Sequence, residues 1–376
     1  MKKENKKFAT LRAWNRKRNY LMKDIRYYIR LLIAKLIWDK RGKNIFDIDT
    51  IKTVLLLRNE GKIGDMIVDT ILIRELNRSG YQVDVVGTKS NCAILKYNPY
   101  VRNIYLAEDI DVTSFMKDYS HNIPFKTLST LKNNNYDLIV DPSLFNTPIH
   151  RLSLFKKINP KNIIGFNKKQ WINHYNKTIF FDYNESHIKF TYESLMNSLG
   201  INVTDFSYDL YYPSEIDIET KKFIDNFKVN SEKIIIINPF AGNIDRCLSV
   251  YQLKRITEKL NNIYGNIKVV FLDHENIIDM SKFDGVYRYQ SESLYHTISM
   301  ISQADLIISP DTSIVHISAA YKKPLVAIYQ DIESNKTLWG PGYDEAIQIL
   351  AKNGRLQENK DIDELVIESV KKIFQP

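Results

Sequence analysis

The feature that most limits the possible folds of this chain is a pattern of short β-branched runs alternating with amphipathic stretches, which occurs twice. The first series begins with TVLLLR at 53–58, and the second begins with KIIIIN at 233–238. This alternation is typical of βαβ units, which build parallel sheets covered by helices. The sequence therefore predicts an α/β protein with two Rossmann-like domains facing across a cleft, where ligands bind at the carboxyl ends of the strands.

The elements expected in each series define the organisation of the chain. In the first series we expect strands at 53–58, 82–88, 101–106, 136–141 and 162–166 and a helix at 65–79, and in the connecting region that follows we expect a helix near 187–199 and a polar, strand-poor stretch through Asn230. In the second we expect strands at 233–238, 268–272, 305–309 and 324–329, and helices at 250–264, 294–303, 312–321 and 361–374, the last of which would cross back between the halves. The predicted parts are an N-terminal arm (1–50), a first Rossmann-like domain (51–185), a connecting region (186–230) and a second Rossmann-like domain (231–376).

Length and composition agree with two domains and exclude several classes. A chain of 376 residues is too long for one ordinary hydrophobic core. Its composition, 44% hydrophobic and 26% charged, is too balanced for a disordered or fibrous chain. No run of eighteen uncharged apolar residues could cross a bilayer. Cys92 and Cys247 are too few and too far apart for a disulfide framework or a metal cluster, so we expect a reducing, cytoplasmic setting.

The basic charge is concentrated at the N-terminus. Residues 1–43 hold 15 Lys or Arg against three acidic residues, whereas the rest of the chain has a slight excess of acidic residues. On a helix, one face of this arm would be apolar and the opposite face polar and mostly basic. The apolar face consists of Leu21, Met22, Ile25, Tyr28, Ile29, Leu32 and Leu36, and the opposite face of Arg16, Asn19, Lys23, Arg26 and Arg30. Such a helix could lie on an anionic membrane surface, or its apolar stripe could pack on the protein body or on a second subunit.

Three loops at predicted strand ends carry chemically useful residues. The loop at 58–65 contains Lys62 and Gly64 and ends in Asp65, which could be a general base or simply a helix cap. The loop at 238–246 ends in Arg246, whose guanidinium suits phosphate oxygens. The loop at 309–316 places small hydroxyl residues before a helix that carries His316, and helix N-termini attract phosphate groups.

Together, these loops resemble those of glycosyltransferase family nine, the ADP-heptose:lipopolysaccharide heptosyltransferases, which have the two-domain GT-B fold. Three segments carry the resemblance: LLLRNEGKIGDMIVDTILIREL, NPFAGNIDR and ISQADLIISPDTSIVHISAAYKKPLVAIY, the last followed by Trp339-Gly340-Pro341. The sequence departs from the family pattern in three places. Ser313 replaces a glycine, Asp245-Arg246 replaces a Lys-Arg pair, and Tyr329-Gln330-Asp331 replaces a Phe-Gly-Pro stretch.

The resemblance implies a division of labour between the domains. Residues 51–185 would bind the acceptor and carry Asp65 as the catalytic base, and residues 231–376 would bind a nucleotide-sugar. The donor-binding residues implied are Lys62, Gly64, Asn238, Gly242, Arg246, Glu275, Asp311, Thr312, Ser313 and His316. No metal and no cofactor are expected, because the Asp-x-Asp pairs at 47–49, 109–111 and 361–363 follow no nucleotide-binding strand and are interpreted as surface loops or helix caps.

The function implied is an inverting, metal-independent transfer of a sugar, with heptose from ADP-heptose as the expected donor group. The acceptor would be a lipid-anchored lipopolysaccharide or lipooligosaccharide core at the cytoplasmic face of the inner membrane, which the basic arm would contact. Two alternatives from other classes are an epimerase-like nucleotide-sugar enzyme of GT-B fold and a nucleic-acid-binding protein that uses the arm. No nucleic-acid-reading motif accompanies the arm, so we expect no nucleic-acid partner.

Overall fold

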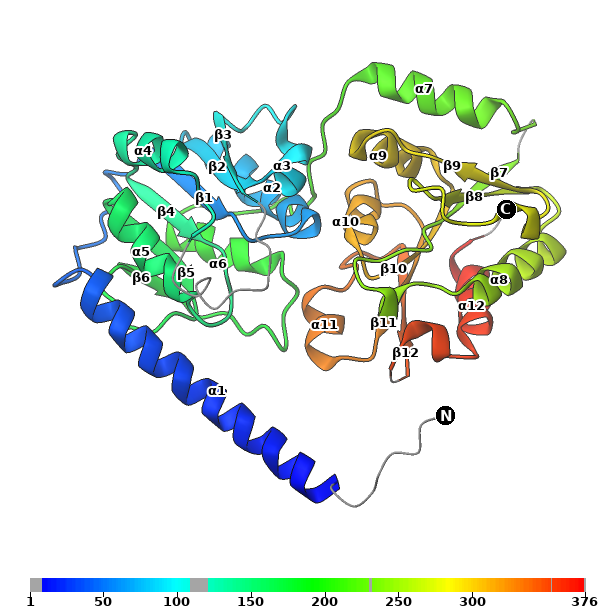
Figure 1. Cartoon of the computed structure of the whole chain (residues 1–376). Helices are drawn as coiled ribbons and strands as arrows, with labels where there is room; N and C mark the ends of the chain where they lie inside the picture. Colours follow the sequence, from blue (N-terminus) through cyan, green and yellow to red (C-terminus); the bar gives the residue numbers. More distant parts are fainter. Residues whose placement is uncertain (1–8, 109–120, 230–231, 353, 375–376) are drawn as a thin grey trace. The chain divides into compact units, whose positions relative to one another are not determined.

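The computed structural model of the chain describes residues 9–108, 121–229, 232–352 and 354–374 and contains two parallel six-stranded sheets (Figure 1). The strand orders are β3-β2-β1-β4-β5-β6 and β12-β11-β10-β7-β8-β9. The first sheet consists of β1 (Thr53–Arg58), β2 (Gln82–Thr88), β3 (Asn103–Ala107), β4 (Leu138–Asp141), β5 (Asn162–Phe166) and β6 (Lys177–Ile179). The second consists of β7 (Lys233–Ile237), β8 (Ile267–Leu272), β9 (Val286–Tyr289), β10 (Leu306–Pro310), β11 (Leu325–Gln330) and β12 (Ala346–Ala351).

The helices connect the strands as the βαβ pattern predicts. They are α1 (Ala9–Trp38), α2 (Ile63–Arg78), α3 (Lys89–Cys92), α4 (Phe125–Asn133), α5 (Ile149–Ile158), α6 (Phe190–Ser198), α7 (Ser214–Asp225), α8 (Val250–Ile263), α9 (Leu294–Gln303), α10 (Ser313–Ala320), α11 (Glu333–Leu338) and α12 (Ile362–Ile373). In both sheets the strand order reverses beside the first strand of the series, between β1 and β4 and between β7 and β10. Ligands of open α/β sheets bind at such switch points, and the three loops singled out above follow β1, β7 and β10.

The α/β class with two Rossmann-like sheets is confirmed, and the strands that the sequence did not predict have a common cause. The structure adds the strands β6, β9 and β12, each of which lies at an edge of its sheet. Edge strands contact a neighbour on one side only, so their sequences mix polar and apolar residues and give a weak signal. It also adds the helices α3, α4, α5, α7 and α11, which the sequence analysis did not predict. In α7, which lies in the connecting region, only Thr220 and Ile224 are buried.

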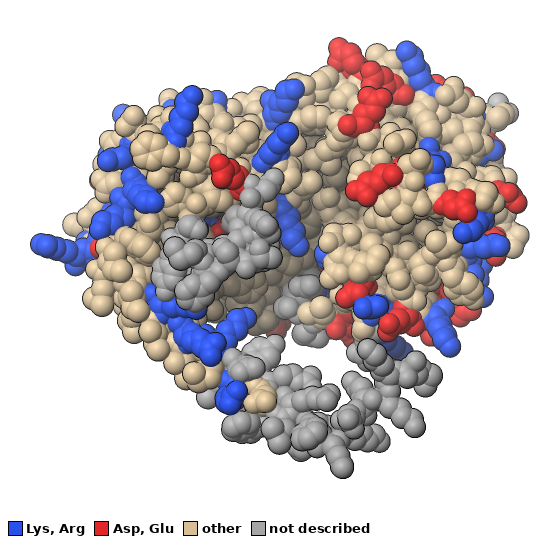
Figure 2. All heavy atoms as spheres, viewed as in Figure 1, with Lys and Arg blue, Asp and Glu red and all other residues tan. Residues whose placement is uncertain are grey.

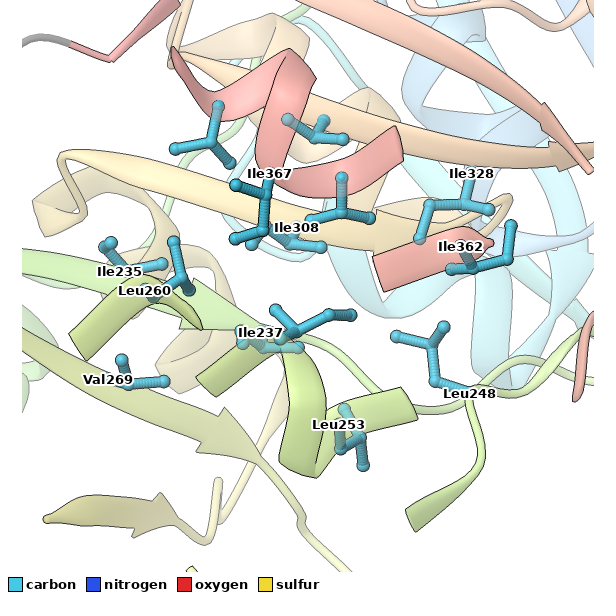
Figure 3. Close-up of a cluster of buried hydrophobic side chains, with 14 of the residues drawn as sticks. Ile235, Ile237, Leu248, Leu253, Leu260, Val269, Ile308, Ile328, Ile362 and Ile367 are labelled. Atoms are coloured by element: carbon cyan, nitrogen blue, oxygen red, sulfur yellow. The ribbon is translucent and has the colours of Figure 1, made fainter. Parts of the chain in front are cut away.

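A cluster of aliphatic side chains forms the core of the second sheet. Figure 3 shows Ile237 of β7, Ile308 of β10 and Ile328 of β11 facing side chains of α8 and α12. The register aligns Ile308 with Ile237 on one side and with Val326 on the other. The prediction that the last helix crosses back between the halves is wrong, because α12 packs on α8, β11 and β12 and buries its apolar face in this core.

The chain divides into two compact units, each of which contains part of the first sheet. Unit 1 is Met1–Val54 with Glu108–Ile179, and unit 2 is Leu55–Ala107 with Phe180–Pro376. Unit 1 holds α1, which packs on α5. None of the described helices is apolar over a long enough stretch to cross a membrane.

The expected N-terminal helix is present as α1, but the expectation that its apolar stripe could pack on the protein body is wrong. Leu31 and Ala34 are fully buried against unit 1, whereas Ile29, Leu32 and Leu36 of the predicted apolar stripe are exposed. The helix therefore contacts the body through the face opposite the stripe. The alternative in which the stripe itself packs on the body does not hold for the described side chains.

Candidate active site

The turn after β1 presents Asp65 at the start of α2. The helix begins at Ile63, and one carboxylate oxygen of Asp65 accepts a hydrogen bond of 2.8 Å from the backbone N–H of Lys62. Asp65 thus satisfies one of the free amides at the helix start. The Asp65 side chain still keeps 21% of its surface exposed. The carboxylate is therefore both part of the helix cap and accessible to a ligand.

A buried ion pair lies directly behind this carboxylate. The Arg58 guanidinium donates two hydrogen bonds, of 2.6 and 2.5 Å, to the carboxylate of Asp69, one helical turn beyond Asp65. Tyr192 of α6 donates its hydroxyl to the same carboxylate and accepts a bond of 3.1 Å from Arg58. The remaining guanidinium nitrogen of Arg58 lies 3.6 Å from Asp65. Because the Asp69 carboxylate holds Arg58, the pKa of the guanidinium is well above its usual range, and a permanent positive charge faces Asp65.

The backbone of the same turn is held by Asn91. Its side-chain amide, buried in α3, donates to the carbonyl of Arg58 at 2.8 Å and to that of Gly61 at 2.7 Å. A side chain on residue 61 is excluded, since an added Cβ would lie 2.2 Å from the Arg58 side chain. The conformation of the turn is therefore fixed from both sides, and with it the position of Asp65.

The loops after β7 and β10 meet around the N-terminus of α10. Thr312 caps this helix by accepting a bond of 3.2 Å from the N–H of Ile314. The buried side-chain amide of Asn238 donates to the hydroxyls of Ser309 (3.0 Å) and Thr312 (3.3 Å) and to the Phe240 carbonyl (3.0 Å). Asn238 thus ties the two loops together, and the free amides of α10 form a partly positive site that suits an anion.

Arg246 provides a cation at the edge of this site. One guanidinium nitrogen donates to the Asp311 carboxylate at 3.0 Å and to the Asp311 carbonyl at 3.3 Å. About a quarter of the Arg246 side chain is exposed. Burial raises the pKa of Asp311, while the charges of Arg246 and Lys62 act in the opposite direction. Arg246 has further donors that can bind a ligand without breaking this pair.

His316 lies between the two sets of loops as a neutral imidazole. Its ring is 5% exposed and makes edge contacts with Tyr208 and Trp339, and burial lowers its pKa to about 4. Its Nδ1 atom is buried without a hydrogen-bond partner. A Cβ on Gly64 would lie 2.9 Å from the ring, so a glycine at this position allows the turn of Asp65 to approach His316.

Two adjoining cavities of about 660 Å³ each collect the predicted site residues. The first is lined by Lys62, Gly64, Asp65, Gly242, Arg246, Asp311, Thr312, Ser313 and His316, together with Ser90 and Trp339. The second contains Asn238 and Glu275 and shares Ile63, Gly242, Thr312 and Ser313 with the first. Every residue that the sequence singled out for the site therefore lines at least one cavity.

Sequence reasoning missed the residues that hold Asp65 in place. Asp69 follows Asp65 at a spacing of four on α2, and this spacing puts two side chains on one helix face, so it was recognisable in principle. Asn91 and Tyr192 lie on other elements and carried no local signal. Trp339 was part of the family resemblance, but its contact with His316 required the fold.

The Asp-x-Asp pairs match the expectation of surface loops or helix caps only in part where they are described, because the pair at 361–363 includes a buried carboxylate. Asp363 is buried and paired with Arg255 at 2.7 Å and Lys259 at 2.6 Å. Asp47 accepts a bond from the backbone N–H of Asp49 in an exposed turn. The pair at 109–111 lies outside the described residues. Within the described parts of the chain, no group of three His, Cys, Asp or Glu side chains is placed to hold a metal ion.

Two parallel six-stranded sheets, each with a strand order that reverses beside the first strand of its series, have the architecture of the GT-B fold. The chain belongs to glycosyltransferase family 9 (heptosyltransferase), whose profile matches residues 125–366. Membership decides between the three classes considered above in favour of a glycosyltransferase.

The chain is also similar to individual family members at low identity. It is 23% identical over 361 residues to a protein of Escherichia coli (strain K12) provisionally named lipopolysaccharide heptosyltransferase 4, covering 93% of this chain and 96% of that one. A glycosyltransferase family 9 structure from Veillonella parvula has a TM-score of 0.68 at 15% identity, covering 88% and 99% of the chains. The structure of E. coli heptosyltransferase WaaC with ADP has a TM-score of 0.64 at 16% identity, and the comparison covers 86% of this chain and 100% of that one. The structure of WaaC with ADP-2-deoxy-2-fluoro heptose has a TM-score of 0.63 at 15% identity, with coverages of 85% and 99%.

Proposed function

We propose that this chain is an inverting, metal-independent heptosyltransferase that moves heptose from ADP-heptose onto a lipopolysaccharide or lipooligosaccharide core. The acceptor is lipid-anchored, and the enzyme works at the cytoplasmic face of the inner membrane, on which the basic arm lies. The family and the relatives' names support the sugar and the acceptor class. The observation that carries the proposal is the sharing of one cavity by Asp65, Arg246, Lys62 and the N-terminus of α10.

The chemistry assigned to Asp65 is proton removal. As the acceptor hydroxyl attacks the anomeric carbon, its proton passes to the Asp65 carboxylate, the new C–O bond forms, and the bond from the anomeric carbon to the diphosphate breaks with its electron pair on the diphosphate oxygen. One displacement of this kind inverts the anomeric configuration. The hydrogen bond from Lys62 engages one carboxylate oxygen, and the other, which lies 3.6 Å from an Arg58 guanidinium nitrogen, is the one assigned to the acceptor proton.

The leaving diphosphate gains negative charge, and this chain supplies cations and amides to stabilise it. Arg246 and Lys62 line the cavity of Asp65, and the amides of Thr312 and Ser313 stand at the start of α10. Charge-assisted bonds from such groups favour the charged diphosphate most once the bond to the sugar has broken. Gly64, Gly242 and Asp311 shape this part of the site, and the neutral imidazole of His316 offers a ring nitrogen to the sugar.

The second cavity fits the nucleoside. It lies at the ends of β7 and β8 and combines the carboxylate of Glu275, for the ribose hydroxyls, with the apolar side chains of Leu272, Ile277 and Leu294 for the base. Asn238 holds the loop that separates nucleoside from diphosphate. A nucleotide therefore spans the two cavities at the residues that they share.

Two measurements test the proposal. Mass spectrometry of the surface glycan from a strain that lacks the gene is expected to reveal a core shortened by one heptose, and loss of a different sugar would refute the donor assignment. With purified protein and chelator, transfer from ADP-heptose is expected to continue, and magnetic resonance of the product is expected to show the inverted anomeric configuration. Loss of transfer on chelation that returns with a divalent metal would refute the metal-free mechanism.

A further inference from the structure

Helix α1 is attached to unit 1 through its carboxyl-terminal half. The backbone N–H groups of Asn173 and His174 donate to the Asp39 carboxylate at 2.7 and 2.8 Å, just after the helix ends. Tyr27 donates its hydroxyl to the carbonyl of Thr147 at 3.1 Å, and Lys156 donates to the carbonyl of Ile37 at 2.9 Å. These bonds and the burial of Leu31 and Ala34 fix how the helix is rotated about its axis.

The fixed rotation turns the apolar stripe outward. Helix geometry of about 100° per residue places Ile25, Ile29, Leu32 and Leu36 nearly opposite the buried face. Among the described side chains of α1, the exposed apolar ones are Met22, Ile25, Tyr28, Ile29, Leu32, Ile33, Leu36 and Ile37, with Leu36 86% exposed. The row from Met22 to Ile37 is about 22 Å long at 1.5 Å per residue. Soluble proteins rarely leave such a continuous apolar row uncovered, so it marks an interaction surface.

Cations and aromatic rings border this row on both sides. Lys23 and Arg26 are exposed along one side of the helix. On the other side lies the exposed 169–171 loop of unit 1. Its Lys169 ammonium is 5.7 Å from the ring of Tyr28 in α1, and the ring of its Trp171 is 5.6 Å from the ammonium of Lys35 in α1. Figure 2 shows several Lys and Arg side chains gathered at the lower left of this face. Amphipathic aromatic rings and basic residues beside an apolar row are typical of a helix that lies in a membrane interface.

We infer that the outward stripe of α1 and the 169–171 loop form one docking surface for an anionic lipid bilayer, with the stripe in the acyl boundary and the Trp171 ring and flanking cations at the headgroups. The inference deepens the proposed function, on which its biological purpose rests, but the binding itself needs no catalysis. Charge complementarity favours anionic lipid over a second copy of the same basic surface, since like charges would face each other.

The attachment of α1 gives this docking a definite geometry. Because the carboxyl end of the helix is bonded to unit 1, a bilayer bound to the stripe holds unit 1 in one orientation instead of on a flexible tether. The 169–171 loop then reaches the same plane as the helix. A helix that served only as a tether would need neither the bonds at Asp39 nor the loop.

Flotation of the full chain with vesicles tests the surface. The triple variant Ile29→Gln/Leu32→Gln/Leu36→Gln removes the stripe while keeping good helix formers. The matched control Ile218→Gln/Ile263→Gln/Leu365→Gln removes three exposed aliphatic side chains from α7, α8 and α12. With vesicles of phosphatidylethanolamine and phosphatidylglycerol, the stripe variant is expected to bind at least about tenfold more weakly. The control and the wild type are expected to bind equally, and both to bind phosphatidylcholine vesicles weakly.

Fluorescence tests the place of the loop. Vesicles are expected to shift the emission of the wild type to shorter wavelength, and Trp171→Phe is expected to reduce that shift while vesicle binding is retained. If Trp171→Phe shows an emission shift as large as that of the wild type, the 169–171 loop is not part of the docking surface.

Other results would overturn the inference. If the stripe variant binds vesicles as strongly as the wild type does, the stripe has no role in lipid binding. A wild-type dimer in sedimentation that the stripe variant converts to monomer would assign the surface to a second copy of the chain. ADP binding, measured on the same samples, is expected to be unchanged in all variants. A failure of docking is thereby separated from a failure of the proposed donor site.

Discussion

The turn after β1 and the loop after β7 occupy equivalent places in their sheets but are built differently. The first is fixed by the buried Arg58–Asp69 ion pair and by the Asn91 amide. The second is largely exposed, with Ile244 69% exposed, and its cation Arg246 is paired only with the partly exposed Asp311 in the contacts described above. A base must be positioned before the substrate arrives, whereas a phosphate-binding cation must be free to exchange partners. The difference predicts that substitutions in the two loops alter different kinetic parameters.

The largest effect is expected for Asp65→Asn. The amide oxygen can still accept the bond from Lys62, so the fold is preserved, but the proton acceptor is lost. Turnover is expected to fall by about two to four orders of magnitude with ADP affinity nearly unchanged. Steady-state kinetics and calorimetry measure the two quantities. Turnover close to that of the wild type in a folded variant would leave Asp65 as a helix cap only.

Arg246→Ala is expected to show the opposite pattern. Loss of a charge-assisted contact to the diphosphate should weaken ADP binding by about 1.5–3 kcal/mol, which calorimetry in the presence of chelator measures. Arg355→Ala is the matched control, because Arg355 pairs with the neighbouring Asp245 at 2.8 Å but does not line the first cavity. Equal ADP affinity of the two variants would contradict the role of Arg246.

Tyr192→Phe tests the rigidity of the first loop without removing a charge. The variant loses the hydroxyl that bonds both Asp69 and Arg58, so we expect kcat to fall about three- to tenfold while KM for the donor stays constant. Tyr175→Phe is the control, since Tyr175 is also buried and donates to an aspartate, Asp141, at 2.6 Å. If both variants lose stability but neither loses kcat, the Tyr192 network is structural only.

The smallest effect on activity is expected for His187→Gln, which instead alters stability with pH. Neutral His187 donates from Nε2 to the Gly340 carbonyl at 2.8 Å, its Nδ1 accepts from the Lys189 N–H at 3.2 Å, and burial lowers its pKa to about 4. The unfolded chain binds this proton near pH 6.5, so the free energy of unfolding should fall as pH drops from about 6.5 to 4, by at most about 3 kcal/mol for this group.

Urea unfolding at several pH values measures this slope. The Gln variant should show a shallower decline than the wild type over the same range. His316, whose pKa is also lowered to about 4, should keep part of the decline in the variant. An identical slope in both proteins would show that His187 does not contribute to it.

The sequence predicts those parts of the structure that are determined by neighbouring residues in the chain, and it does not predict contacts that depend on the tertiary fold. The central strand β1 appears at its predicted residues because its continuous apolar run leaves little choice. Asp65, Arg246 and His316 were recognisable because each belongs to a loop motif at a strand end. The partners of Asp65 were not, since Tyr192 meets Asp69 across 123 positions and only the packing of α6 on α2 brings them together. Edge strands such as β9 were missed for the same reason, because their pairing is settled by the sheet and not by their own residues.

The close approach of Arg58 to Gly61 makes the two positions dependent on each other during sequence change. Arg58 cannot move aside for a Cβ at 61, because Asp69 and Tyr192 hold it. Gly61→Ala alone should therefore be harmful, whereas the same change beside a smaller residue at 58 should cost little more than the loss of Arg58 by itself. Such coupling, measurable by a double-mutant cycle, means that homologous sequences could replace Gly61 only where residue 58 is already smaller than arginine.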